Sequence, residues 1–299
     1  MREVPSVSQS PLAAWLTLRG QPSAACRAIA RQVEAMGYGT LWIPETLTSN
    51  EVFTQAGVLL AATEKLAVAS GIANIWARDA TATAAAAHTL NDAYPGRFVL
   101  GLGTSHATRV ADRGQAYSRP LTFMRDYLDS LDSAGPFQPQ HERRVPVVLA
   151  ALRPKMQELA RERADGIHSF CAPPEHTADA RKRLGGGPLL VPHQAFIIGT
   201  PDARTYQKAH AFVASRLTLP NYVNHFRALG FTDNDFEGGG SQKLIDSLVV
   251  IADEDTVMRR MRAHLDAGAT QVAAHPLIDE PDGGVAQLKL LAQSLRTSA

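Results

Sequence analysis

Cysteine is scarce in this chain of 299 residues, which contains only two. Cys26 and Cys171 stand alone and far apart, so they provide neither a disulfide framework nor the closely spaced pairs of a zinc site. This pattern excludes a small secreted domain held together by disulfides. We also expect no metal site.

An excess of charge of one sign is also absent, because 30 basic residues balance 29 acidic ones and leave a net charge of +1. No general attraction to nucleic acid or to an anionic membrane follows from that balance. No apolar run is long enough to span a bilayer, and residues 1–10 lack the apolar core of a signal peptide. We therefore expect a cytoplasmic protein that acts on a small molecule, with no nucleic-acid or membrane partner.

What the chain does contain is a regular alternation of short apolar runs and helical patterns, repeated about eight times, as in a closed parallel barrel. It predicts one α/β domain over residues 1–299, a (β/α)8 TIM barrel, with an insertion at about residues 220–240 before the last barrel units. An open doubly wound sheet is the alternative, but the repeat count and the lack of Gly-x-Gly-x-x-Gly after the first strand argue against it. The runs expected to form strands are residues 12–18, 40–43, 66–76, 98–102, 145–151, 166–170, 189–198 and 271–276.

The fourth of these runs ends in a glycine-rich segment. Residues 98–102 form a short apolar run, and Gly101-Leu102-Gly103 leads into Thr104 and Ser105. Glycines at a strand end let the backbone turn sharply or approach a ligand closely, and the hydroxyl and N–H groups that follow are suitable donors for a phosphate. A pair of barrel-corner glycines with no ligand is an equal alternative at this point.

The third run is interrupted in its middle by Ser70-Gly71. A glycine inside a strand indicates a bulge or a close backbone contact. Taken together, this run and the Gly-Leu-Gly segment resemble the luciferase-like monooxygenase superfamily, most closely its branch that transfers hydride with the deazaflavin coenzyme F420. The resemblance extends over essentially the whole chain.

The resemblance implies a barrel of the bacterial-luciferase type with a non-proline cis peptide in the third-strand bulge, behind the deazaflavin ring. The matching bond here is Gly71–Ile72 or, as the second choice, Ser70–Gly71. It also implies that the loop after the fourth strand holds the cofactor phosphate. The residues that the resemblance places in the cofactor site are Thr46, Ser70, Gly71, Ile72, Asn74, Gly103, Thr104, Ser105, His106 and Ala107.

Two residues are candidates for exchanging a proton with the substrate. Glu45 stands where relatives have an acidic residue near the ring, and His106 lies in the phosphate loop. Thr46 stands where the sugar-phosphate dehydrogenases of this family have a catalytic histidine, so the resemblance does not carry over their general base. Glu45 has a second interpretation, as the ion-pair partner of an arginine at a strand end.

The resulting hypothesis is an oxidoreductase that transfers a hydride between coenzyme F420 and an unidentified small organic substrate. One alternative is an FMN-dependent luciferase-like monooxygenase with the same barrel. Another is a catalytically degenerate barrel that only binds a ligand, an idea favoured by Thr46 in place of the histidine. The relatives also suggest a homodimer.

Overall fold

The computed structural model describes residues 10–138, 144–278 and 284–296. Its strands match the expected runs, and the third run, residues 66–76, divides at the predicted break into β3 and β4. One strand, β9, was not predicted. The strands are β1 Leu12–Trp15, β2 Thr40–Ile43, β3 Ala67–Ser70, β4 Ala73–Asn74, β5 Phe98–Gly103, β6 Val147–Ala150, β7 Gly166–Ser169, β8 Leu189–Ile198, β9 Val249–Ala252 and β10 Val272–Pro276.

All strand pairs are parallel, and the sheet closes on itself as predicted. The barrel runs β1-β2-β3-β5-β6-β7-β8-β10, and β10 returns to β1 with Leu12 opposite Val272. β4 continues the line of β3 along β5, and β9 pairs with the second half of β8. The fold is therefore a closed (β/α)8 barrel.

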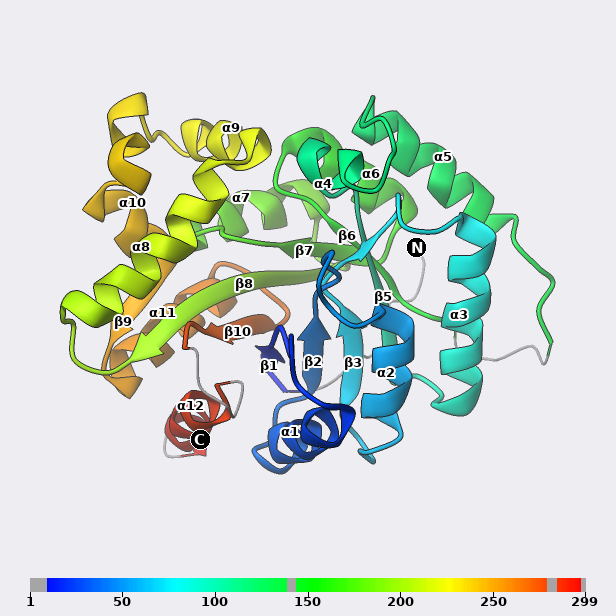
Figure 1. The fold of residues 1–299 in the computed structure, drawn as a ribbon, viewed down its shortest axis with the longest axis horizontal. Helices are drawn as coiled ribbons and strands as arrows, with labels where there is room; N and C mark the ends of the chain where they lie inside the picture. Colours follow the sequence, from blue (N-terminus) through cyan, green and yellow to red (C-terminus); the bar gives the residue numbers. More distant parts are fainter. Residues whose placement is uncertain (1–9, 139–143, 279–283, 297–299) are drawn as a thin grey trace.

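Helices surround the strands on the outside (Figure 1). In α1 the buried residues are Cys26, Ile29, Ala30 and Val33, the spacing of a single helical face turned toward the barrel. The helices are α1 Ser23–Ala35, α2 Val52–Leu60, α3 Ala80–Ala93, α4 Ala107–Ala111, α5 Pro120–Asp132, α6 Pro154–Arg163, α7 Pro174–Leu184, α8 Ala203–Leu217, α9 Pro220–Ala228, α10 Gln242–Leu248, α11 Glu254–Asp266 and α12 Val285–Arg296, with 3-10 turns η1 Asp233–Asp235 and η2 Glu237–Gly239. None of the helices within the described ranges is both long and apolar enough to cross a membrane.

The segment before the last barrel unit is larger than the predicted insertion. It runs from α9 through η1 and η2 into α10 and β9, and it has an apolar core of its own with α8. In Figure 1, α8, α9 and α10 gather on one side of the barrel. α9 reaches the ends of β5 and β6, because the Asn221 side chain contacts His106 and the Asn224 backbone carbonyl accepts from Arg153. α9 therefore lies over the carboxyl ends of these strands, where barrel enzymes have their active sites.

Candidate active site

The predicted bulge separates β3 from β4, and its cis peptide is the Gly71–Ile72 bond, the first of the two expected choices. The Ser70 hydroxyl accepts the Gly101 N–H at 2.9 Å and donates to the Gly101 carbonyl at 2.8 Å. The Gly71 N–H donates to the Ile43 carbonyl at 2.7 Å. The Ser70 hydroxyl is thus engaged in fixing the bulge to β5.

The Gly-Leu-Gly motif has a physical reason that the sequence alone did not reveal. A Cβ atom at Gly101 would lie 1.9 Å from the Ser70 carbonyl oxygen, and one at Gly103 would lie 2.4 Å from Cδ1 of Ile72. Both glycines therefore make room for the bulge. The Ile72 side chain, half-buried, rises at the mouth of the barrel beside Gly103 and Ala150.

Glu45, at the end of β2, uses its carboxylate to hold the loop that follows the bulge. One oxygen accepts the Asn74 N–H at 2.7 Å and the Arg78 Nη1–H at 2.9 Å, and the other binds Nη2 of Arg78. Arg78 also contacts Glu51 at 3.1 Å. The Glu45 side chain is 5% exposed and that of Arg78 16%, so the pair is largely removed from water. This geometry favours the ion-pair interpretation, and a role of Glu45 in proton exchange stays a prediction.

We expect Glu45→Gln to lower the free energy of unfolding by about 3 kcal/mol, because it leaves the largely buried Arg78 charge with only the more exposed Glu51 as an acidic partner among the described residues. Urea denaturation measures the loss. The matched control is Asp179→Asn, which breaks an exposed pair with Lys182 and should cost less than about 1 kcal/mol. Unchanged stability of the Glu45 variant, together with lost turnover, would instead make Glu45 a catalytic group.

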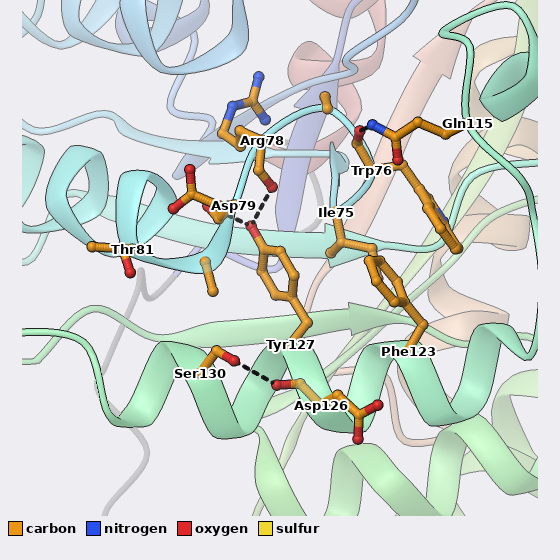
Figure 2. Close-up of a pocket in the computed structure, with 12 residues that line it drawn as sticks. Ile75, Trp76, Arg78, Asp79, Thr81, Gln115, Phe123, Asp126, Tyr127 and Ser130 are labelled. Carbon is orange, nitrogen blue, oxygen red and sulfur yellow. Dashed lines mark hydrogen bonds between the residues drawn. The ribbon is translucent and has the colours of Figure 1, made fainter.

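The outer side of the same loop lines a cavity of about 500 Å³ between the start of α3 and α5. Figure 2 shows Tyr127 donating to the carbonyls of Arg78 and Asp79, and Gln115 donating to that of Trp76. The Trp76 ring stacks on Phe123 at 3.9 Å. None of the predicted site residues lines this cavity. We therefore assign it to the support of the loop and place the active site at the barrel mouth.

The loop after β5 holds the predicted phosphate-binding residues. The hydroxyl groups of Thr104 and Ser105 are half-buried and make no hydrogen bond to any described residue, and Ser105 has a positive φ of 55°. The Thr104 carbonyl accepts the Trp76 indole N–H at 3.0 Å, which ties this loop to the one that Glu45 holds. Ala107 is exposed at the first position of the one-turn helix α4. These residues form one rim of the mouth.

His106 lies on the same rim and contacts the insertion. Its Nδ1 is 2.8 Å from Oδ1 of Asn221, and its ring lies 5.5 Å from that of Tyr222. Burial lowers the pKa of His106, and the positive charges of Arg109 and Arg216 add to that effect, whereas the hydrogen bond to Asn221 opposes it. His106 is therefore neutral at pH 7. Its proposed part in proton exchange stays a prediction.

Thr46 and Asn74 complete the predicted set. The Thr46 hydroxyl is buried and has no hydrogen-bond partner among the described residues, although its N–H donates to the Ser49 hydroxyl at 2.9 Å. A buried hydroxyl with no partner at the end of β2 is available to a ligand. Asn74 uses its side-chain oxygen for the Trp76 N–H at 3.1 Å, so it shapes the loop.

Sequence reasoning missed a layer of aromatic and imidazole rings inside the barrel. Trp42 stacks on His168 at 4.5 Å, and the Nε2 of His193 lies 2.8 Å from the Nδ1 of His275. Trp15 packs against His275 at 4.4 Å. Burial lowers the pKa of His168 to about 4 and that of His275 to about 3. A histidine between apolar neighbours in a buried strand is a signal that could have found this layer, since such strands are otherwise continuously apolar.

Several polar atoms of this layer have no hydrogen-bond partner among the described residues. They are Trp15 Nε1, Trp42 Nε1, His168 Nε2 and His193 Nδ1. The bulge lies directly against the layer, because a Cβ at Gly71 would be 3.1 Å from Trp15 Nε1. Above it, the Phe170 ring stacks on His193 at 3.8 Å. The floor of the mouth thus combines unbonded ring nitrogens, such as Trp15 Nε1 and His168 Nε2, with the apolar ring of Phe170.

Known proteins resemble this chain in sequence and in fold. The family model of luciferase-like monooxygenases matches residues 6–271. A 5,10-methylenetetrahydromethanopterin reductase of Methanolobus tindarius is 23% identical over 286 residues, covering 82% of this chain and 88% of the reductase. Among solved structures, an F420-dependent secondary alcohol dehydrogenase with an F420–acetone adduct superposes with a TM-score of 0.76 at 13% identity, over 95% of this chain and 98% of that one. The oxygenating component of 3,6-diketocamphane monooxygenase from Pseudomonas putida, in complex with FMN, superposes with a TM-score of 0.68 at 12% identity, over 95% and 96%. This chain belongs to the luciferase-like monooxygenase family.

Proposed function

We propose that this protein is an oxidoreductase that transfers a hydride between coenzyme F420 and a small organic substrate. The observation that carries the proposal is the bulge between β3 and β4, which presents Ile72 beside Gly103 at the mouth of the barrel. Family membership supports it, as do the reductase and the F420-dependent dehydrogenase described above. The homodimer implied by the family resemblance stays a prediction.

The residues present fit a deazaflavin. Ile72 would lie behind the ring. The Thr46 hydroxyl, which has no partner among the described residues, would hydrogen-bond the edge of the ring. The Thr104 and Ser105 hydroxyls, which bond no described residue, would hold the phosphate. When bound, the deazaflavin supplies or accepts a hydride at one ring carbon. The work of the chain is to orient that carbon against the substrate and exclude water. Glu45 holds the loop behind the ring in position.

Two alternatives lead to different measurements. FMN is held in the same fold by the 3,6-diketocamphane monooxygenase component, so an oxygen-consuming reaction is the second candidate. A barrel without catalysis is the third, and Thr46 at the position of the relatives' histidine is the observation in its favour. Deazaflavins do not readily use molecular oxygen, so oxygen consumption separates the first two.

The test is a fluorescence titration of the purified protein with oxidised F420 and, separately, with FMN. We expect saturable binding of F420 and no binding of FMN. Ile72→Glu should abolish that binding, because it places a carboxylate where the ring rests and where the acidic cofactor would be repelled. Ile72→Val, which removes one methylene, should change the affinity little.

Binding of FMN alone would move the protein to the oxygen-using members of the family. Binding of neither cofactor would favour the barrel without catalysis. Equal F420 affinity of the Glu and Val variants would show that the cofactor binds away from the bulge, and it would overturn the placement of the site.

A further inference from the structure

Arg216, on α8, is a half-buried cation with no carboxylate partner among the residues that the structure describes. Its Nη1 donates to the Phe212 carbonyl at 3.0 Å and to the Ser215 hydroxyl at 2.6 Å. Its guanidinium carbon lies 3.8 Å from the centre of the Phe212 ring and 5.3 Å from that of Phe170. Arg78 and Arg144, by contrast, pair with acids. The Cys171 thiol is a further neutral partner of Arg216. A positive charge that has ring faces and neutral groups as its partners is available to an anion.

The same aromatic rings connect Arg216 to the histidine pair inside the barrel. Phe212 lies 5.8 Å from the His275 ring and 6.1 Å from that of His193, and Phe170 stacks on His193. His275 is 8% exposed against 2% for His193, so it is the outer member of the pair. The Nε2 of His275 makes no hydrogen bond within the described ranges, whereas its Nδ1 is held by His193. His275 is therefore oriented with its free nitrogen available to a ligand.

The groups around this pair are almost all uncharged. His193 comes from β8, Trp15 from β1, His168 from β7 and Arg216 from α8, and Phe170 directly follows β7. Burial first, and then the Arg216 charge, lowers the pKa of His275 to about 3. An anion bound to Arg216 would offset that charge and make a proton on His275 less costly. Binding of an anion and proton exchange at His275 are thus coupled by the geometry.

We propose that this side of the mouth binds the anionic end of the substrate, an organic acid whose reacting alcohol or carbonyl lies a few bonds from its carboxylate, with Arg216 as the counter-charge and His275 exchanging the proton with the reacting oxygen. The inference rests on the proposed hydride transfer and deepens it. His193 is a positioning residue that fixes the His275 ring. In this proposal His275 exchanges the proton, whereas Glu45 is engaged by Arg78. His106, whose Nδ1 is held by Asn221, stays the alternative proton-exchanging group.

The step balances in both directions. In reduction, the substrate carbonyl carbon accepts the hydride that reduced F420 supplies, and the carbonyl π electrons move to oxygen. That oxygen takes the Nε2 proton of doubly protonated His275, the cation that the anion at Arg216 makes less costly. His275 returns to the neutral form and later takes up another proton from solvent. In oxidation, neutral His275 accepts the hydroxyl proton while the carbon loses its hydride to oxidised F420.

The experiment uses small oxo acids as probes, with the full chain both free and loaded with F420. Oxamate and levulinate, which differ in spacing between carboxylate and carbonyl, are each compared with their neutral amides. We expect saturable binding of at least one acid and none of its amide. Arg216→Gln should lower the affinity for the acid by roughly tenfold or more, the usual effect of losing a charge-assisted hydrogen bond. Arg204→Gln, on the exposed start of the same helix, is the matched control and should leave the affinity unchanged.

A second readout follows the imidazole nitrogens of His275 by NMR. The Nε2 signal of His275 is identified by its loss in His275→Gln, and acid binding should shift it. His193→Gln should change the pH at which this signal titrates, but it should not prevent acid binding. Absence of acid binding in both the free and the F420-loaded protein would overturn the inference. So would an Arg216→Gln variant that binds the acid normally but binds F420 more weakly, because the anion would then be the cofactor's own tail. F420 titration without any acid tests the proposed function separately, so the two failures are distinguishable.

Discussion

Lowering the pH from 7 to 5 is expected to remove several kcal/mol of the folding free energy and to unfold a large part of the population. The cause is a set of buried histidines that fold in the neutral form. Burial lowers the pKa of His168 to about 4, and the pKa values of His225, His264 and His275 to about 3. Since domains are typically stable by only about 5–15 kcal/mol, even a few such groups decide the outcome.

The sign follows from proton counting. In the unfolded chain each of these histidines titrates at its ordinary pKa of about 6.5, whereas in the folded chain it stays neutral until much lower pH. The unfolded state therefore binds more protons below pH 6.5, and stability falls as the pH falls toward the folded pKa values. Full stability is present above pH 6.5. Each histidine that stays neutral in the fold lowers the free energy of unfolding by about 2 kcal/mol at pH 5.

His225 offers a clean variant for this test. Its ring lies edge-on to His176 at 5.0 Å, and its Nε2 has no partner among the described residues, so phenylalanine can occupy the same space. Urea denaturation at a series of pH values gives the slope of the unfolding free energy against pH. We expect His225→Phe to reduce that slope by about 1.4 kcal/mol per pH unit between pH 6 and 4.5, the value of one proton.

The matched control is His210→Gln, which removes a histidine bonded to the Gly238 carbonyl at the exposed surface. The slope of the unfolding free energy against pH should be the same in this variant as in the wild type. A wild-type unfolding free energy that is flat between pH 7 and 5 would contradict the prediction, since it would mean that these rings take up protons inside the fold.

The same histidines show where sequence reasoning stops. The (β/α)8 barrel and the bulge followed from runs such as residues 98–102 and from Ser70-Gly71, because strand formers and a mid-strand glycine act locally. The pairing of His193 with His275 depends on β8 and β10 lying side by side with Ala273 opposite His193, a contact between distant parts of the chain. No spacing in the sequence reveals such a pair.

The candidate site divides in the same way. Its bulge was predictable because the Ser70-Gly71 signal is contiguous in the sequence, whereas the phosphate-binding role of Thr104 and Ser105 stays a prediction. The partner of Glu45 was open, since Arg78 reaches it only after the chain passes through β3 and the bulge. β9 and the packing of α9 on the mouth were also missed, because their cause is the fit of one apolar surface to another and not a hydrophobic period.

Replacing Gly101 by alanine is expected to be a strongly destabilising single-methyl change in the barrel. The added Cβ would lie 1.9 Å from the Ser70 carbonyl oxygen, which is a backbone atom, and 3.4 Å from Cζ3 of Trp42. The bulge cannot move away easily, because the Ser70 hydroxyl and the Gly71 N–H bind it to both neighbouring strands. We expect a loss of about 3 kcal/mol or more, the upper end for overpacking of a well-filled core.

Two alanine variants serve as controls, because they add the same methyl group where the structure has space. Gly57→Ala, inside α2, would make only an ordinary contact of 3.5 Å with Leu90, and it should stabilise the protein by about 0.5–1 kcal/mol through helix propensity. Gly186→Ala, in the open turn before β8, has nothing within 4 Å and should be neutral.

Urea denaturation of all three variants gives the ranking, and F420 titration of folded Gly101→Ala at low temperature then reports on the bulge itself. Because the methyl group must push the bulge toward the mouth, F420 affinity should fall more in this variant than in either control. A Gly101→Ala protein with wild-type stability and wild-type F420 affinity would show that the bulge adjusts freely, and the proposed role of the Gly-Leu-Gly segment in fixing it would have to be given up.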